Sequence, residues 1–319
     1  MVTNLRILNL EPEGYSIKAK AILESIGQVF DGPMSREQLL ELIKNYDILI
    51  VRLGHRIDAQ VIDSAKRLKT IVTATTGLNH IDMNEAQRRG IKVLSLQGEQ
   101  TFLDTIHATA EHTWTLLLAL LRKLPQAHQH VLSGGWERDL FKGRELYGRT
   151  LGIIGVGRLG SKIAAYGAAF GMRVIGYDKN KPHARTANLE LMDLNKVLPL
   201  SDVISLHVNY NIENHAMISR KELALMKPGT MLINTSRGEL VDEEALLDAL
   251  RSGNLGGAAL DVLCGEYASR DTTEELLEYA RQHDNLIVTP HIGGCTFDSM
   301  EKTEMFMAEK LFRYLKKEG

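Results

Sequence analysis

One glycine-rich segment constrains the fold of this chain more than any other feature. An apolar run, residues 150–154, precedes three glycines in the spacing G-x-G-x-x-G, and an alanine-rich segment, residues 161–170, follows them. The glycines are Gly155, Gly157 and Gly160. In this pattern the first glycine allows a tight turn, the second lets the backbone approach a pyrophosphate, and the third lets a helix pack closely on a sheet. The segment therefore predicts a strand, a phosphate-binding turn and a helix.

The same segment predicts which dinucleotide is bound. Arg158 and Leu159 complete the turn, and the start of the following helix offers free N–H groups to phosphates. A second apolar run, residues 173–177, ends at Asp178, eighteen residues after the last glycine. A carboxylate at this position accepts hydrogen bonds from both ribose hydroxyls and repels a 2′-phosphate, so the predicted cofactor is NAD rather than NADP.

Length, charge and cysteine content exclude several classes of protein. At 319 residues the chain exceeds the usual size of one core, which favours two domains. The formal net charge of -2 is spread along the chain, so we expect no nucleic-acid or anionic-membrane partner. The longest apolar run, residues 114–121, is too short to span a bilayer, and residues 1–10 resemble a strand rather than a secretion signal. Cys264 and Cys295 suit a reducing cytoplasm, and no metal site is predicted.

Strand and helix patterns alternate along most of the chain, which predicts parallel α/β organisation in both halves. Helical stretches are expected at residues 36–44 and 59–68. The strands expected in the first hundred residues are 5–10, 48–51, 71–74 and 92–96. Six more strands, the number in a complete dinucleotide-binding sheet, are expected at 150–154, 173–177, 203–207, 231–234, 258–260 and 286–288.

A long apolar helix is predicted over residues 108–124, ended by Pro125. It is apolar on more than one face through Leu116, Leu117, Leu118, Leu120 and Leu121. Because such a helix needs a partner surface, we expect it to be buried between domains or in a subunit interface.

Three consecutive predicted strands are each followed by a polar residue whose side chain could take part in catalysis or binding. Arg237 follows residues 231–234, Glu266 follows 258–260, and His291 follows 286–288. In doubly wound sheets, ligands bind outside the carboxyl ends of the strands. The pattern therefore predicts that a cation, a carboxylate and an imidazole face one crevice.

This set of side chains suits the oxidation of a 2-hydroxy acid. His291 would take the hydroxyl proton as general base while a hydride leaves for the nicotinamide, and would return the proton in the reduction. Glu266 would hold the imidazole in one tautomer. Arg237, a planar guanidinium, would bind the substrate carboxylate, and backbone N–H groups of the loop at Thr76 and Gly77 would complete that site from the other domain.

Several ordered motifs together resemble one protein family. Besides the glycine motif and Asp178, they are residues 234–242 (NTSRGELVD), residues 259–262 (ALDV) leading to Glu266, and residues 289–294 (TPHIGG). In this combination the chain resembles the D-isomer-specific 2-hydroxyacid dehydrogenases of the phosphoglycerate dehydrogenase type, without the regulatory domain that some of them carry at the C-terminus. The resemblance extends to residues 51–52, 76–82 and 110–112, and so covers nearly the whole chain.

The resemblance implies an α/β fold of two doubly wound parallel-sheet domains. A flavodoxin-like substrate domain would comprise residues 1–103 and 292–319, and a Rossmann NAD-binding domain, residues 104–291, would be inserted in it. The family's catalytic set would fall on Arg237, Glu266 and His291, and its homodimer would be built around the helix at 108–124. Cofactor contacts are implied at Gly155, Gly157, Arg158, Leu159, Gly160, Asp178, His207, Thr235, Ser236, Asp261, His291 and Gly293.

The residues implied to bind the substrate are Arg52, Thr76, Gly77 and Arg237. Arg52 has two interpretations. With His55 and Arg56 close behind it, it would bind a phosphate or second carboxylate of the substrate, or it would be an ordinary solvated loop residue.

Two other functions stay open on the sequence alone. A redox-sensing binding protein of the same fold would bind NAD as a ligand, as some transcriptional corepressors do, although such proteins usually need docking surfaces or extensions that we do not expect here. A hydride-transfer enzyme acting on formate or phosphite is the second, because an arginine that binds an anion does not exclude it. Turnover measurements separate the three.

Overall fold

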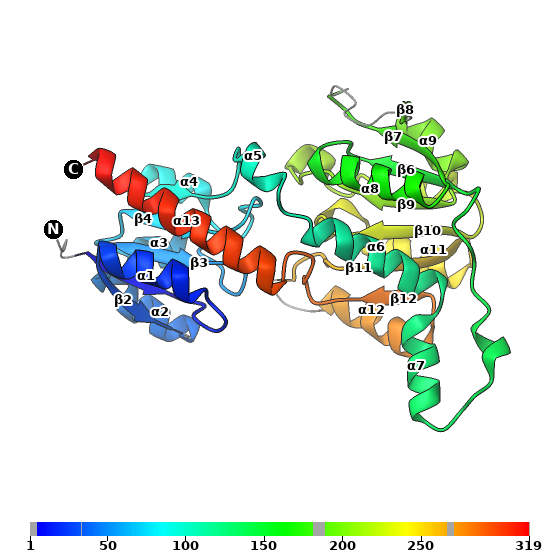
Figure 1. Ribbon diagram of the computed structural model, residues 1–319, viewed down its shortest axis with the longest axis horizontal. Helices are drawn as coiled ribbons and strands as arrows, with labels where there is room; N and C mark the ends of the chain where they lie inside the picture. The colour runs from blue at the N-terminus through cyan, green and yellow to red at the C-terminus, as the bar shows by residue number, and fades with distance from the viewer. Residues whose placement is uncertain (1–4, 33, 181–188, 267–270, 319) are drawn as a thin grey trace. The chain divides into compact units, whose positions relative to one another are not determined.

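The chain forms two compact α/β units in the computed structural model, which describes residues 5–32, 34–180, 189–266 and 271–318 (Figure 1). Unit 1 comprises Met1–Ile106 and Cys295–Gly319, and unit 2 comprises His107–Gly294. Each boundary lies three residues beyond the expected one, at 106 against 103 and at 294 against 291. Every strand pairing in both units is parallel, so the predicted fold class is confirmed.

Unit 1 contains a five-stranded sheet in the order β2-β1-β3-β4-β5, the strand order of flavodoxin-like sheets. The strands are β1 (Arg6–Asn9), β2 (Gln28–Asp31), β3 (Ile48–Val51), β4 (Thr70–Thr73) and β5 (Lys92–Leu94). The sequence prediction missed β2. This edge strand has exposed residues at both ends and only two half-buried apolar residues, Val29 and Phe30, so its apolar signal is weak.

Helices cover both faces of this sheet (Figure 1). Helices α1 (Ile17–Ile26) and α13 (Phe297–Glu318) pack on one face, where Leu23 and Leu311 are fully buried. The other face carries α2 (Arg36–Leu42), continued by the 3₁₀ turn η1 (Ile43–Asn45), with α3 (Ala59–Ser64) and α4 (Met83–Arg88). The short α5 (Gln100–Leu103) follows the last strand. The C-terminal helix therefore belongs to the core of the N-terminal unit.

Unit 2 contains a seven-stranded sheet in the order β12-β11-β10-β9-β6-β7-β8. Its strands are β6 (Thr150–Ile154), β7 (Arg173–Tyr177), β8 (Glu190–Leu191), β9 (Val203–Leu206), β10 (Thr230–Asn234), β11 (Leu255–Leu260) and β12 (Leu286–Val288). The expectation of six strands was wrong because β8, with two residues, is too short to give a pattern. The chain reverses direction across the sheet between β6 and β9, and this switch point is where such sheets bind ligands.

The helices of unit 2 enclose a second pair of apolar cores. One face of the sheet carries α6 (Ala108–Leu121) and α8 (Arg158–Ala169). On the other face lie α9 (Leu194–Leu200), α10 (Arg220–Leu225), α11 (Glu243–Arg251) and α12 (Asp271–Gln282). The 3₁₀ turns are η2 (Arg138–Phe141), η3 (Ile212–Asn214) and η4 (Gly238–Leu240). No helix among the described residues combines the length and apolarity needed to cross a membrane.

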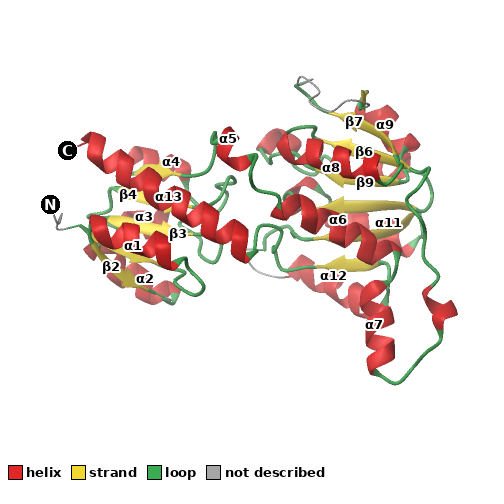
Figure 2. Cartoon of the chain, viewed as in Figure 1, coloured by secondary structure: helices red, strands yellow, loops and turns green. Residues whose placement is uncertain are grey.

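The prediction of one helix over residues 108–124 was wrong. Helix α6 ends at Leu121, Lys123 adopts a left-handed conformation with φ 49°, and α7 (Leu124–Leu132) begins directly after it (Figure 2). Pro125 lies in the first turn of α7, where a helix needs no N–H donor, so it starts a helix rather than ending one. Four leucines of α6 are buried in the core of unit 2 itself: Leu116, Leu117, Leu120 and Leu121. That core meets the need of this helix for an apolar partner.

Candidate active site

The predicted phosphate-binding turn lies between β6 and α8. Gly155 has φ +92°, and a Cβ there would lie 2.5 Å from the carbonyl oxygen of His207, so only glycine fits. A Cβ at Gly160 would collide with the carbonyl oxygen of Gly155, whereas nothing lies within 4 Å of a Cβ at Gly157. Arg158 begins α8 directly afterwards, followed by Leu159. The turn thus leaves open space at the helix N-terminus, where a dinucleotide pyrophosphate fits.

Asp178 is fixed next to this turn at the end of β7. Its Oδ2 accepts a hydrogen bond from the N–H of Val156 at 2.9 Å, and its Oδ1 accepts one from the N–H of Asn180 at 3.0 Å. The neighbouring Lys179 is ion-paired with Glu213, with Nζ and Oε2 2.8 Å apart. The carboxylate is therefore held at the glycine turn with acceptor capacity left for a ribose, and the next cation along the chain is paired.

His291 and Glu266 are in direct contact. Nδ1 of His291 lies 2.6 Å from Oε1 of Glu266, and the two side chains are 20% and 19% exposed. The backbone of His291 is left-handed, with φ 54°, and its N–H donates to the carbonyl oxygen of Asp261 at 2.8 Å. A non-glycine residue in this conformation must be held by its surroundings. The site thus pairs a solvent-reachable imidazole with a carboxylate on a constrained loop.

Asp261, at the end of β11, holds that loop. Its Oδ1 accepts hydrogen bonds from the N–H of Ile292 at 2.8 Å and from Oγ1 of Thr289 at 2.6 Å, and its Oδ2 accepts one from the N–H of Gly293 at 2.7 Å. Nε2 of His112, on α6, lies 3.1 Å from Oδ1. Burial raises the pKa of Asp261, but the hydrogen bonds from these four partners outweigh it and hold the pKa below its usual range. Asp261 therefore stays ionised and anchors the loop that carries the imidazole.

Arg237 lies on a turn that is pressed against the loop leading to Glu266. The side-chain amide of Asn234, at the end of β10, donates to the carbonyl oxygen of Arg237 at 2.8 Å and so fixes the turn. A Cβ at Gly238 would collide with the carbonyl carbon of Leu263, so only glycine allows the two loops to approach this closely. The structure therefore brings the three strand-end loops together.

Thr235 and Ser236 precede this arginine, and the protein itself positions both hydroxyls. Oγ1 of Thr235 is buried and lies 2.7 Å from Oγ1 of Thr113 on α6. Oγ of Ser236 donates to the carbonyl oxygen of Leu206 at 2.7 Å. These contacts tie the turn after β10 to α6 and to β9.

His207 follows β9 and lies beneath the glycine turn. Its Nε2 is 2.8 Å from Oγ of Ser205, and its Nδ1 is a buried atom for which the described residues provide no hydrogen-bond partner. Burial lowers the pKa of His207 to about 3, so the ring is neutral at physiological pH. This histidine therefore acts as a neutral packing group against the turn.

The predicted site residues of unit 1 have different surroundings: Thr76 and Gly77 lie on an accessible loop, whereas Arg52 is ion-paired with glutamates of the same unit. The loop after β4 is stiffened by a hydrogen bond from Oγ1 of Thr75 to the carbonyl oxygen of Gly77 at 2.8 Å, and Thr76 is exposed. The Arg52 side chain is 19% exposed and is ion-paired within unit 1. Its Nη1 lies 2.9 Å from Oε1 of Glu304 and its Nε lies 3.5 Å from Oε2 of Glu11.

Sequence reasoning missed two residues around the His291–Glu266 pair. His112 belongs to the resembling segment 110–112, but no local pattern points to its contact with Asp261. Glu243 looks like an ordinary acidic residue in the first turn of α11, yet its Oε1 accepts a hydrogen bond from the N–H of Cys264 at 2.6 Å. Burial, with the charges of Glu239 and Glu266, raises the pKa of Glu243.

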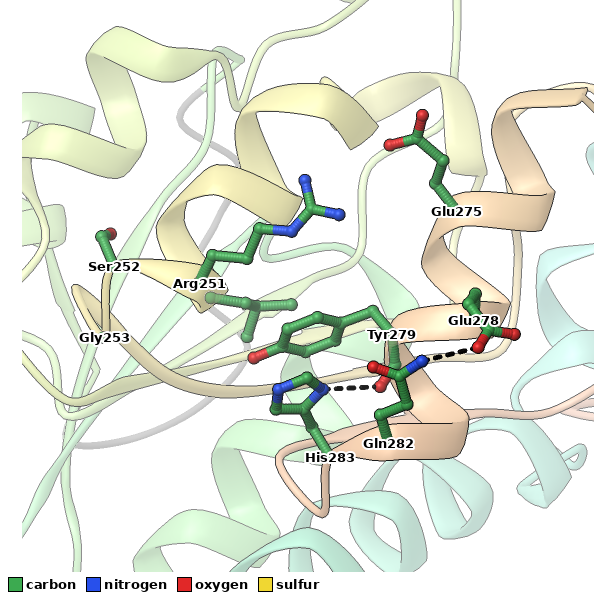
Figure 3. Close-up of a pocket in the computed structure, with 9 residues that line it drawn as sticks. Arg251, Ser252, Gly253, Glu275, Glu278, Tyr279, Gln282 and His283 are labelled. Atoms are coloured by element: carbon green, nitrogen blue, oxygen red, sulfur yellow. Dashed lines mark hydrogen bonds between the residues drawn. The ribbon is translucent and has the colours of Figure 1, made fainter.

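A separate pocket of about 640 Å³ lies between the C-terminal parts of α11 and α12 (Figure 3). The rings of Tyr279 and His283 stack there with centroids 3.9 Å apart, and Nε2 of Gln282 donates to Oε1 of Glu278 at 2.6 Å. None of the nine lining residues is a predicted site residue. The pocket adds nothing to the site built around His291.

Comparison with known proteins supports the same assignment. The family model of the D-isomer specific 2-hydroxyacid dehydrogenase, NAD binding domain, matches residues 114–293, more than half of the chain. D-3-phosphoglycerate dehydrogenase of Methanocaldococcus jannaschii is 38% identical over 301 residues, which cover 93% of this chain and 55% of that protein. The chain thus spans about half the length of this relative.

Two further proteins match over most of their own length. Hydroxypyruvate reductase of Thermotoga maritima is 36% identical over 282 residues, covering 88% of this chain and 89% of that protein. The crystal structure of D-lactate dehydrogenase from Aquifex aeolicus, complexed with NAD and lactic acid, superposes with a TM-score of 0.85 at 30% identity, covering 98% of this chain and 95% of that one.

Proposed function

The chain belongs to the D-isomer specific 2-hydroxyacid dehydrogenase family, and from this premise we propose that it transfers a hydride between NAD and C2 of a small (R)-2-hydroxy acid or its 2-keto acid. The observation that carries the proposal is the hydrogen bond between Nδ1 of His291 and Oε1 of Glu266, at 2.6 Å, in the unit that also contains the dinucleotide turn. The two elements supply the proton carrier and the cofactor cradle that this reaction needs.

The dyad divides the work of proton transfer. In the tautomer that donates its Nδ1 proton to Glu266, Nε2 of His291 is the ring nitrogen that would take the hydroxyl proton of the 2-hydroxy acid. The imidazolium that results is stabilised by the adjacent carboxylate, and in the reduction it returns the proton to the carbonyl oxygen. The anchoring of the loop by Asp261 keeps Nε2 in one orientation throughout.

Arg237 is proposed to bind the substrate carboxylate. Its planar guanidinium matches a carboxylate in two parallel hydrogen bonds, and its positive charge polarises the carbonyl next to that carboxylate. The rigid turn from Asn234 to Gly238 holds it against the loop that leads to Glu266. Orientation of the reacting carbon is thus a property of the turn as well as of the side chain.

NAD, when bound, supplies the hydride acceptor of the reaction. The turn at Gly155, Gly157 and Gly160 would hold its pyrophosphate through backbone N–H groups at the start of α8. Asp178 would accept hydrogen bonds from the adenosine ribose hydroxyls.

The proposal is tested by following NADH oxidation at 340 nm with the purified protein and a panel of 2-keto acids. Glyoxylate, pyruvate, hydroxypyruvate, 2-oxoglutarate and 3-phosphohydroxypyruvate cover small, neutral and anionic tails. Turnover of at least one, lost in His291→Ala, is the expected result. NADH binding without turnover of any would overturn the proposal in favour of a sensor, and NAD reduction by formate or phosphite alone would make it a different hydride-transfer enzyme.

We also propose that the chain forms a homodimer through α7, the segment after it and the C-terminal end of α6, rather than through the buried leucines of α6. No residue of α7 is buried, although Leu124, Val131 and Leu132 are apolar. Trp136, in the following segment, is 83% exposed. Exposed apolar side chains gathered on one element favour a protein partner. A groove of about 520 Å³ lies where residues 143–147 end the segment that follows α7. Its lining includes Leu118, Arg122, Tyr147 and Phe170. We propose that this groove receives the apolar residues of the second copy.

Light scattering coupled to size-exclusion chromatography tests the dimer. The wild-type chain is expected at twice its 35.6 kDa mass, and the double variant Leu132→Asp, Trp136→Asp at the single mass. The matched control is Ile212→Asp, an exposed apolar residue on η3, which should stay dimeric. A wild-type monomer, or a double variant that remains dimeric, would contradict the proposed surface.

A further inference from the structure

Strand ends gather polar residues at the carboxyl edge of the unit 1 sheet. Glu11 follows β1, Arg52 follows β3, and Thr76 and Gly77 follow β4. Because β1, β3 and β4 are adjacent and parallel, these residues share one edge. Arg52, Thr76 and Gly77 are the predicted substrate residues of this unit, so we expect the chemistry of this edge to bear on which substrate tails are accepted.

The loop after β3 has the backbone of an anion site, but a side chain of the same chain occupies it. Oε1 of Glu11 accepts hydrogen bonds from the N–H of Arg52 at 2.7 Å and from the N–H of Gly54 at 3.2 Å. A Cβ at Gly54 would lie 3.2 Å from the Glu11 carboxylate, so the loop closes tightly around it. The carboxylate takes the place that a ligand's phosphate or carboxylate would take.

All three nitrogens of the Arg52 guanidinium contact protein groups. Nη1 donates to Oε1 of Glu304 at 2.9 Å and lies 4.0 Å from Sδ of Met300. Nη2 donates to the carbonyl oxygens of Glu11 and Glu13, each at 3.2 Å, and Nε lies 3.5 Å from Oε2 of Glu11. Three of these contacts are hydrogen bonds to oxygen, and the Nε contact is a longer ion-pair contact with the Glu11 carboxylate. An anionic tail would have to displace protein groups to reach it.

Glu304 makes that displacement costly. Its side chain, on α13, is 1% exposed, and its Oε2 accepts a hydrogen bond from the N–H of Ser16 at 2.7 Å. Burial raises the pKa of Glu304, opposed by the Ser16 hydrogen bond and by Arg52. Removing Arg52 from a buried carboxylate leaves an unpaired charge, which proteins avoid. Arg52 therefore links the end of β3, the loop at residues 11–16 and α13.

We propose that Glu11 is a built-in anion that occupies the potential anion site of this edge, so that Arg52 is a structural clasp and the enzyme selects 2-keto acids with uncharged tails. Substrates with a phosphate or a second carboxylate on the tail are disfavoured, because they meet two carboxylates around one guanidinium. This inference rests on the proposed function and names its substrate class.

The test compares hydroxypyruvate with 3-phosphohydroxypyruvate, which share a carbon skeleton and differ by one phosphate. The wild-type enzyme is expected to have a kcat/KM at least about tenfold higher for hydroxypyruvate. Glu11→Gln keeps an acceptor for the two backbone N–H groups and removes the charge, so it should shift the ratio of the two kcat/KM values about tenfold toward 3-phosphohydroxypyruvate. Glu24→Gln, an exposed glutamate on α1, is the matched control and should leave the ratio unchanged.

A second measurement does not need turnover. Inorganic phosphate should raise the Tm of Glu11→Gln more than an equal concentration of chloride does. For the wild type and for Glu24→Gln, phosphate and chloride should change the Tm equally. A wild-type preference for 3-phosphohydroxypyruvate, or equal responses of wild type and Glu11→Gln to phosphate, would overturn the inference and leave the proposed function standing. If no 2-keto acid of the panel is turned over although NADH binds, the proposed function fails, and the phosphate response alone decides the role of Glu11.

Discussion

In both units an arginine closely follows a parallel strand, Arg237 after β10 in unit 2 and Arg52 after β3 in unit 1. In unit 2 the neighbouring strand ends add an imidazole and a carboxylate that bind each other at 2.6 Å. In unit 1 the carboxylates turn to the arginine itself, with contacts of 2.9 and 3.5 Å. A strand-end position thus places a polar side chain at the carboxyl edge of either sheet, and the residues on neighbouring strand ends decide which protein groups it contacts.

A carboxylate organises each edge, and it does so in the same way. Asp261 accepts hydrogen bonds from backbone N–H groups of the loop that carries His291, and Glu11 accepts them from the loop that carries Arg52. The two side chains are equally exposed, His291 at 20% and Arg52 at 19%. They differ in their partners, because His291 contacts the single carboxylate of Glu266 whereas Arg52 lies between those of Glu304 and Glu11.

Replacement of His291 by alanine should abolish most of the catalytic activity that we assign to the strand ends of unit 2. Without the proton carrier, turnover of 2-keto acids is expected to fall by about 10²–10⁴, because general acid–base catalysis contributes a factor of this size. NADH binding, measured by fluorescence titration, should stay nearly intact because the glycine turn is untouched.

His283→Ala is the matched control, since His283 lies exposed just after α12 and outside the site built around His291. Its turnover should equal that of the wild type. Near wild-type turnover of His291→Ala would remove the imidazole from the mechanism, and the contrast between the two edges would lose its basis.

Replacement of Arg52 by alanine should instead affect stability. The change leaves Glu304 buried without its cation, so the free energy of unfolding should fall by about 3 kcal/mol. Both tryptophans, Trp114 and Trp136, belong to unit 2, so urea unfolding should be followed by far-UV circular dichroism as well as fluorescence.

The matched control is Arg36→Ala, which breaks an ion pair with Asp58 at 2.7 Å whose side chains are 41% and 31% exposed. Exposed pairs contribute roughly 0–1 kcal/mol. Equal losses of unfolding free energy in Arg52→Ala and Arg36→Ala would mean that the contacts of Arg52 with Glu304 and Glu11 do not stabilise unit 1 more than a surface ion pair does.

Sequence reasoning reached the features that short-range patterns encode. The glycine spacing predicts the turn at Gly155 because tight turns are set by a few consecutive residues. Apolar runs predict most strands, and the rule that parallel strands end at one edge places His291 and Glu266 close together. The structure has both features, although the two residues lie 25 positions apart in the chain.

Sequence reasoning failed where partners are distant or signals are weak. Arg52 and Glu304 are 252 positions apart, and His112 and Asp261 are 149 apart, so no local pattern predicts either contact. Strand β2 is half-exposed, and β8 has two residues. A proline can follow the end of one helix or lie in the first turn of the next, so Pro125 alone does not tell which occurs. The left-handed backbone of Lys123, which separates α6 from α7, is visible only in the structure.

Asp178 sharpens the comparison because it caps backbone, as Glu11 does, and is still expected to meet a ligand. Asp178→Asn keeps an acceptor for the N–H of Val156 and removes the charge that repels a 2′-phosphate. The ratio of kcat/KM for NADPH to that for NADH should therefore rise about tenfold. Asp193→Asn, an exposed aspartate before α9, should leave the ratio unchanged. An unchanged ratio in Asp178→Asn would place cofactor discrimination elsewhere.

His207 tests whether the contrast belongs to the units or to local surroundings, because it follows a strand in unit 2 and yet is enclosed as Arg52 is. Its pKa of about 3 lies below the ordinary value of 6.5, so between these values the unfolded chain binds more protons than the folded one. Stability from this group is full above pH 6.5 and falls as the pH is lowered, by about 1 kcal/mol between pH 7 and pH 5.5. Urea unfolding at both pH values should show a smaller acid loss in His207→Asn than in the wild type or in His283→Asn. Equal acid losses in all three would mean that the imidazole is charged in the fold, and that the unit 2 edge is open at β9 as well as at β12.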